Sequence, residues 1–145
     1  MPDREELTRR DAEAWRQFEA LLAAVPTERR ETPDLEGGWS VKDVLWHIGF
    51  WWDDFRQTVE TGEEAADDGD ESTDDVNHRE QERSRSMSWN AVRSAVLERR
   101  VAMLAAWREL PEIDDRVAES FVSETVEHYD EHAPQLRELL DADDD

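Results

Sequence analysis

Three of the four histidines in this chain have the spacing expected of metal ligands. His128 and His132 are four residues apart, so on a helix their side chains lie one above the other on the same face. His47 occurs much earlier, within an apolar helical pattern. Two imidazoles from one helix and a third from a facing helix would form a tripod that leaves coordination positions open, as in catalytic metal sites.

The nature of these ligands limits the choice of metal. The chain has no cysteine, which excludes thiolate ligands, thiolate nucleophiles and disulfides. Imidazole ligands suit zinc, nickel, iron or copper rather than calcium. A single histidine on a core-facing stripe is usually an ordinary core residue, but three buried neutral imidazoles need three sets of hydrogen-bond partners. A shared cation satisfies them together, so we predict a divalent-metal site at His47, His128 and His132.

A second motif overlaps the C-terminal histidine pair. The segment from His128 to His132 matches H-x-x-E-H, the inverted zinc-protease pattern in which the glutamate, here Glu131, acts as base. Acidic residues number 39 of 145, so a carboxylate at this position arises easily by coincidence. Glu131 is also turned about 100° from the face of the adjacent His132 and is expected to face solvent. We therefore prefer the tripod to the protease interpretation.

Few other side chains are candidates for chemistry. Tyr129 is the candidate catalytic residue, as a base or as a group that orients a ligand, although a tyrosine in this position more often packs in a helical core. His78 follows an acidic segment and is expected to be exposed. Three tryptophans could form the walls of a pocket: Trp46, Trp51 and Trp52.

The elements that position these residues are all predicted to be helices. No stretch shows sustained period-two alternation with β-branched residues. Apolar residues recur at helical spacing over four segments: about 3–25, from Ser40 to about 60, 88–110, and about 117–140. Pro134 is expected to kink the last helix just beyond the histidines. The remaining segments are predicted as a loop at 26–38, an acidic mobile loop at 61–75, a region at 76–87 that is either loop or an extra helical turn, and an acidic tail at 141–145.

The second helix carries the clearest start signal. Ser40 is a good N-cap, and Asp43 three residues later completes a variant of the capping box with Asp in place of Glu. Trp39 and Val44 have the spacing of a hydrophobic staple. Four amphipathic helices of this length predict an all-α fold, a four-helix bundle in one domain spanning residues 1–145. The connection after the second helix is long enough to retrace a helix of roughly 30 Å, so the order up-down-down-up is expected.

The charge balance limits the partners. The net charge is −22, Lys42 is the only lysine, and every other basic residue is arginine. Such a surface repels nucleic acid and anionic lipid. No apolar run approaches the length of a membrane span, and the charged N-terminus lacks the apolar stretch of a signal peptide. We expect a cytoplasmic protein, and the excess of acid over lysine favours a salt-loving organism, where molar salt shortens the Debye length to roughly 3 Å.

Two blocks of sequence carry a resemblance to a known family. The first is Gly38-Trp39-Ser40-Val41-Lys42-Asp43-Val44-Leu45-Trp46-His47, which contains W-S-x-x-D-x-x-x-H at the start of the second helix. The second is His128-x-x-x-His132-x-x-Gln135. Together they resemble the DinB-like superfamily, which includes the metal-binding domain of mycothiol-dependent maleylpyruvate isomerase, and the resemblance covers roughly residues 4–140. Val76-Asn77 and His128-Tyr129 resemble the colibactin-resistance-like (DfsB/ClbS) branch.

The resemblance implies an up-down-down-up bundle with a divalent metal, most often nickel or zinc, held by His47, His128 and His132. Some members of the family are transferases or isomerases that use a small cellular thiol, while others are hydrolases or resistance proteins. The chain departs from the family at Pro134, where an Arg-Gly pair commonly precedes the glutamine, and this leaves the position of Gln135 open.

Three functions fit these observations. The first is a metal-dependent enzyme that activates water or an external small thiol on a small-molecule substrate; any thiol must be a co-substrate, since the chain has no cysteine. The second is a binding or resistance protein that sequesters a small molecule without turnover. The third is a purely structural bundle, for example a homodimer formed through aromatic faces.

Overall fold

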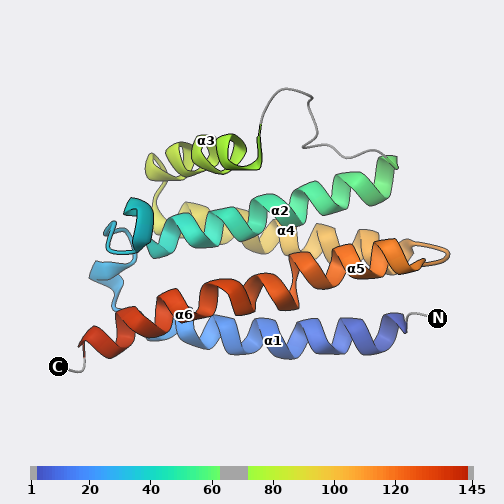
Figure 1. Cartoon of the computed structure of the whole chain (residues 1–145), viewed down its shortest axis with the longest axis horizontal. Helices are drawn as coiled ribbons and strands as arrows, with labels where there is room; N and C mark the ends of the chain where they lie inside the picture. Colours follow the sequence, from blue (N-terminus) through green and yellow to red (C-terminus); the bar gives the residue numbers. More distant parts are fainter. Residues whose placement is uncertain (1–2, 63–71, 144–145) are drawn as a thin grey trace.

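The computed structural model describes residues 3–62 and 72–143, and this part of the chain is all-helical (Figure 1). The α-helices in chain order are α1 (Arg4–Ala24), α2 (Val41–Thr61), α3 (Thr73–Arg85), α4 (Trp89–Glu109), α5 (Asp115–Glu124) and α6 (Val126–Asp143). Short 3₁₀ turns span Thr27–Arg29 and Glu36–Gly38. The all-α prediction is confirmed. No helix in the described ranges combines the length and the apolar character that a bilayer span requires.

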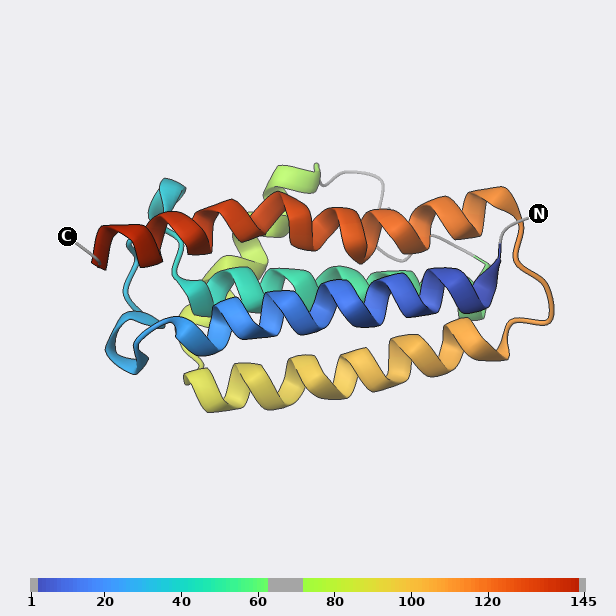
Figure 2. The same cartoon turned by 90° about the horizontal axis from the view of Figure 1, so that it is seen from below.

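The long helices lie side by side in two opposite directions. α2 and α4 run one way, and α1 runs the other way together with the α5–α6 pair (Figures 1 and 2). α2 packs mainly against α4, and α1 packs mainly against α6. The shorter α3 lies on the outside of α2 (Figure 1). This arrangement brings the start of α2 and the middle of α6, which are far apart in the sequence, into one region.

The predicted start of α2 is confirmed. The Ser40 side chain accepts a hydrogen bond from Asp43 N at 3.1 Å, and the Asp43 carboxylate accepts one from Ser40 N at 3.0 Å. This reciprocal box satisfies two backbone donors that a helix end leaves without partners. Asp43 also accepts from the Ser84 hydroxyl of α3, so the same carboxylate ties α3 to the start of α2.

The only lysine of the chain joins three segments near this point. Lys42 is 4% exposed, and its ammonium donates to the carbonyl of Arg85, the last residue of α3, at 3.5 Å and to that of Met87, just after α3, at 2.7 Å. It also forms an ion pair at 3.1 Å with Glu31, in the segment before α2. A cation beside the C-terminal carbonyls of a helix is favourable, because those carbonyls have no partner within the helix.

The acidic loop predicted at 61–75 is shorter than expected. Thr61 belongs to α2, and 73–75 form the first turn of α3. Ser72 caps this turn by accepting from Asp75 N, and Asp74 and Asp75 lie at the helix N-terminus, where negative charge is stabilising. The ambiguous region at 76–87 is therefore mostly helix. The rest of the acidic segment, 63–71, lies outside the described residues, as do 144–145 of the predicted tail; residues 141–143 belong to α6.

The last predicted helix contains a break that was not predicted from the sequence. The break falls at Thr125, before the histidines, where φ is −117° and ψ is −95°. Thr125 Oγ1 donates to the Phe121 carbonyl at 2.7 Å, and the Trp52 indole donates to the Glu124 carbonyl at 3.0 Å. These contacts satisfy carbonyls at the end of α5. Beyond the break, α6 continues through Pro134 to Asp143, so the proline does not end the helix.

A glycine sets the distance between α2 and α4. Gly49 is buried, and a Cβ atom added to it would lie 2.8 Å from Val96 Cγ2 on α4. Real Cβ atoms do not approach another carbon so closely. The absence of a side chain therefore allows α2, which carries His47, to pack tightly against α4.

We predict that Gly49→Ala destabilises the protein by about 1–3 kcal/mol through overpacking, although alanine is the better helix former. Urea unfolding followed by circular dichroism gives the free energy of unfolding. In a Val96→Ala background the same substitution should cost less, because the clashing methyl groups are absent. An equal penalty in both backgrounds would show that this contact does not control the packing.

Candidate metal centre

The structure brings His47, His128 and His132 together. His47 lies on α2 and the other two lie on α6, and the centroids of their rings are 4.8 to 5.0 Å apart. One ring nitrogen from each histidine can be chosen so that all three lie within 4.8 Å of one another. His128 is buried, and the other two are partly buried. The convergence predicted from the residue spacing is therefore present.

A hydrogen-bonded hub sets the rotation of α6. Tyr129, the residue after His128, donates its hydroxyl to Asp11 Oδ1 at 2.8 Å and accepts from Arg100 at 3.2 Å. Asp11 and Arg100 form an ion pair at 2.8 Å, and both Asp11 and Tyr129 are buried. This hub joins α1, α4 and α6. Because successive helical residues point in different directions, a Tyr129 held towards α1 and α4 leaves His128 and His132 turned towards α2.

The ring nitrogens of the histidines are incompletely satisfied by the protein. His47 Nε2 and His128 Nε2 lie 3.0 Å apart. His128 Nδ1 and His132 Nε2 are buried and have no hydrogen-bond partner. Buried polar atoms without partners are rare in native proteins, and each calls for a ligand, an ion or a water. A cation bound to the imidazoles would satisfy His132 Nε2 and relieve the close approach of two nitrogens.

A nearby amide selects the tautomer of one imidazole. His132 Nδ1 lies 2.8 Å from Gln135 Oε1, and an amide oxygen only accepts hydrogen bonds. The Nδ1 atom therefore carries a proton, and in the neutral ring this leaves the lone pair of Nε2 available to a metal. This is the usual role of outer-shell acceptors in metal sites. The Pro134 departure from the family pattern thus leaves Gln135 in contact with the site.

Burial keeps the imidazoles of His47 and His128 neutral. It lowers the pKa of His47 to about 3, and the two neighbouring histidines add to the effect, while the amide of Asn77 on α3 opposes it. Burial also lowers the pKa of His128 to about 3, with His132 as the second cause. A protonated imidazole has no lone pair for a metal, so these shifts leave both rings competent to bind a cation at neutral pH.

The aromatic neighbours divide between the site and the core. Trp39 contacts His47 edge-on with ring centroids 5.4 Å apart. Trp51 donates to Asn77 Oδ1 at 2.9 Å, and Asn77 also acts on His47. By contrast, the Trp46 indole donates a hydrogen bond to the Glu80 carboxylate, and Trp52 is buried in the core against the end of α5. Asn77 could not be predicted as a site residue from the sequence, because its role depends on how α3 packs on α2.

The remaining candidates lie away from the imidazole cluster or are already paired. The Tyr129 hydroxyl is held by Asp11 and Arg100, an arrangement that suits a positioning role. Glu131, the base of the alternative protease motif, is exposed. His78 is exposed as predicted and lies 3.3 Å from Glu82.

A carboxyl group that was not predicted from the sequence lies four residues before His128, on the other side of the break at Thr125. Glu124 is the last residue of α5 and is partly buried. Burial raises its pKa to about 7, and the negative charges of Asp54 on α2 and Glu131 on α6 add to the effect. In a chain with 39 acidic residues, no local pattern marks this one, because its environment arises only when α5 packs on α2.

Fold and site together define a class: helical proteins with an imidazole tripod between two of their helices. The model of the DinB superfamily matches residues 10–142, and the chain belongs to this superfamily. The predicted family is therefore confirmed. No curated protein and no solved structure matched the chain.

The pKa of Glu124 predicts a pH-dependent effect of Glu124→Gln. The pKa is about 7 in the folded state and near 4.5 in the unfolded state, so the folded state binds more protons between these values and loses stability as pH rises through them. The variant should therefore be more stable than the wild type at pH 8 by up to about 3 kcal/mol, and similar to it at pH 5. Urea unfolding of both proteins, in molar KCl with a chelator, measures the difference.

The exposed residue Glu127 provides the matched control for this measurement. Glu127→Gln removes the same charge from the start of α6 and should change stability by a similar amount at both pH values. A Glu124→Gln effect that is equally independent of pH would contradict the raised pKa.

Proposed function

We propose that this protein is a divalent-metal-dependent enzyme of the DinB type, with the metal held by His47, His128 and His132. The observation that carries the proposal is the convergence of three imidazoles on one point, where a buried ring nitrogen lacks a protein partner. Membership of the DinB superfamily supports it. We also propose the up-down-down-up bundle order. It is supported by the directions of the helices, since α1 and α6 run one way and α2 and α4 run the opposite way (Figure 1).

Each part of the site would have a defined role in the reaction. When bound, the cation would lower the pKa of a water or a small thiol in an open coordination position towards neutrality. Gln135 holds the His132 imidazole in the tautomer that presents Nε2. Trp39 packs against the His47 ring in a T-shaped contact. The Asp11–Arg100–Tyr129 hub holds the two α6 histidines in position.

We propose zinc or nickel as the metal, with iron also compatible, since neutral imidazoles without thiolates suit these ions. The substrate class is a small molecule. A low-molecular-weight thiol would be a co-substrate, because the chain supplies no thiol of its own. Transferase, isomerase and hydrolase chemistry all fit such a site. We keep the cytoplasm of a salt-loving organism as the proposed location, from the charge balance.

The alternative function is non-catalytic binding of a small molecule, as in a resistance protein of the same fold. One observation favours it: the hydroxyl of Tyr129, the candidate base, is already bound to Asp11 and Arg100. The metal would then anchor a ligand without turnover.

We predict that protein purified without a His tag binds about one equivalent of Zn²⁺ or Ni²⁺, measured by elemental analysis after dialysis against the metal. His47→Ala should retain less than about a tenth of an equivalent, because two imidazoles on one helix make an incomplete tripod. His78→Ala removes the remaining histidine, which is exposed and outside the cluster, and should bind like the wild type. Full stoichiometry in His47→Ala, with its helical circular dichroism intact, would contradict the assignment.

Turnover separates the enzyme from the binding protein. The metal-loaded protein should consume a small thiol together with an electrophile, or hydrolyse an activated ester, at a rate that falls at least about 100-fold in His47→Ala. His78→Ala is again the control. Stoichiometric binding of a substrate without turnover, at full metal occupancy, would instead support the sequestration function.

A further inference from the structure

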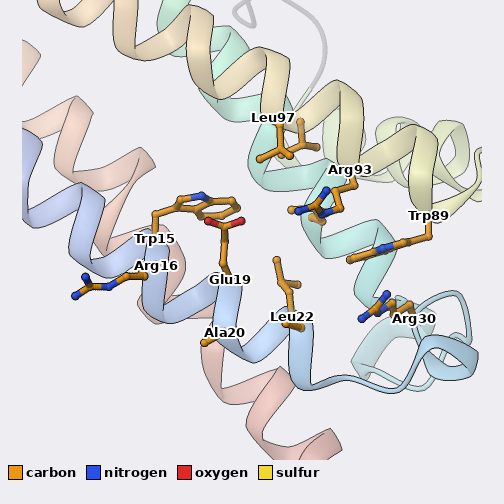
Figure 3. A pocket seen from close by; sticks show the side chains of 12 residues that line it. Trp15, Arg16, Glu19, Ala20, Leu22, Arg30, Trp89, Arg93 and Leu97 are labelled. Carbon is orange, nitrogen blue, oxygen red and sulfur yellow. The ribbon is translucent and has the colours of Figure 1, made fainter.

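A pocket of about 440 Å³ lies between α1 and the first half of α4 (Figure 3). It shares no residue with the imidazole cluster. Leu45 of α2 lines the pocket, whereas His47, two positions later, is turned about 200° away around the helix. Pocket and tripod therefore lie on opposite sides of α2. The volume is in the range of small-molecule sites.

Cationic side chains are concentrated at this pocket. Although the chain has 39 acidic and 17 basic residues, three arginines line it: Arg16, Arg30 and Arg93. Figure 3 shows Arg30 and Arg93 on either side of the Trp89 indole, while Arg16 extends away from the pocket. Arg93 makes no ion pair with any residue in the described part of the chain, unlike Arg9, Arg56 and Arg100. Its charge is available to a ligand.

The second arginine is held in place by the fold. Arg30 Nε donates to the Val25 carbonyl at 3.2 Å, and its guanidinium lies 5.0 Å from the centre of the Trp89 ring. The Trp89 indole is thus a flat, partly buried surface beside the Arg30 guanidinium, and Arg93 lies four residues further along α4. Guanidinium groups bind carboxylates through paired hydrogen bonds, and a flat aromatic surface favours a planar ligand.

The rest of the lining is mostly apolar, with one acidic side chain. The floor is formed by Trp15, Leu22, Leu45, Val96 and Leu97. Glu19 of α1 is the single acidic residue of the lining, and its carboxylate lies beside Trp15, away from Trp89 (Figure 3). Together with the net charge of −22, Glu19 disfavours a ligand with several negative charges.

We propose that this pocket binds a small aromatic monocarboxylate. Its carboxylate would be bound by Arg93 and Arg30 beside Trp89, and its ring would lie on the apolar floor towards Trp15 and Leu97. The proposal is independent of the metal centre, since neither site contributes a residue to the other.

The test uses 1-naphthoate as the probe and 1-naphthalenemethanol as its neutral counterpart. Binding is followed by nuclear magnetic resonance through the indole N–H signal of Trp89, assigned with Trp89→Phe. Naphthoate should shift this signal in a saturable manner, and Arg93→Gln should weaken binding at least about tenfold, through loss of a charge-assisted hydrogen bond. Arg93 is exposed and without an ion pair in the described residues, so its substitution should leave the fold intact.

A matched control removes the same charge elsewhere. Arg10→Gln, at an exposed position of α1 outside the pocket, should change naphthoate affinity by less than about twofold. His47→Ala should bind naphthoate like the wild type, which separates this site from carboxylate binding at a metal. Equal affinity for the neutral alcohol, equal weakening by Arg10→Gln, or no shift of the Trp89 signal would overturn the proposal. So would a dimer in sedimentation whose formation depends on Arg93, since a second copy would then be the occupant.

Discussion

The arrangement of the candidate site depends on a buried ion pair, Asp11–Arg100, capped by the Tyr129 hydroxyl. Removing two charges from water is costly, so such a pair is tolerated only when both partners are well satisfied. Here Asp11 accepts from Arg100 and Tyr129, and the Arg100 guanidinium also lies over the rings of Trp15 and Trp52. The hub draws α1, α4 and α6 to one point, and by holding Tyr129 it sets the direction of the adjacent His128.

Bringing the three imidazoles together has a cost in desolvation. Histidines close together in a partly buried position give up hydrogen bonds to water, and the protein replaces only some of them, through Gln135 and Asn77. The nitrogen atoms left over are on the rings that face one another. Burying these ring nitrogens without partners lowers the stability of the folded protein. A bound cation would offset this cost, so stability would depend on the metal.

Local sequence signals predicted the parts of this structure that depend on neighbours in the chain. The i, i+4 spacing placed His128 and His132 on one face, and the Ser40–Asp43 box marked the start of α2. The break at Thr125 could not be foreseen, because it depends on an indole from α2 reaching the Glu124 carbonyl. α3 was also unclear from its pattern: Val76 is its only buried apolar residue, and it packs through the polar side chains of Glu80, Gln81 and Ser84. Asp11 and Arg100 give no local hint of being partners.

The position of Lys42 has a practical consequence for covalent labelling. As the only lysine, it holds the single side-chain amine of the chain, and that amine is enclosed by Glu31 and the carbonyls after α3. Acylating reagents and amine-directed crosslinkers therefore meet no accessible lysine on the folded surface. Acylation of Lys42 becomes a reporter of local opening, because the reagent can reach it only when the segment before α2 and the end of α3 separate.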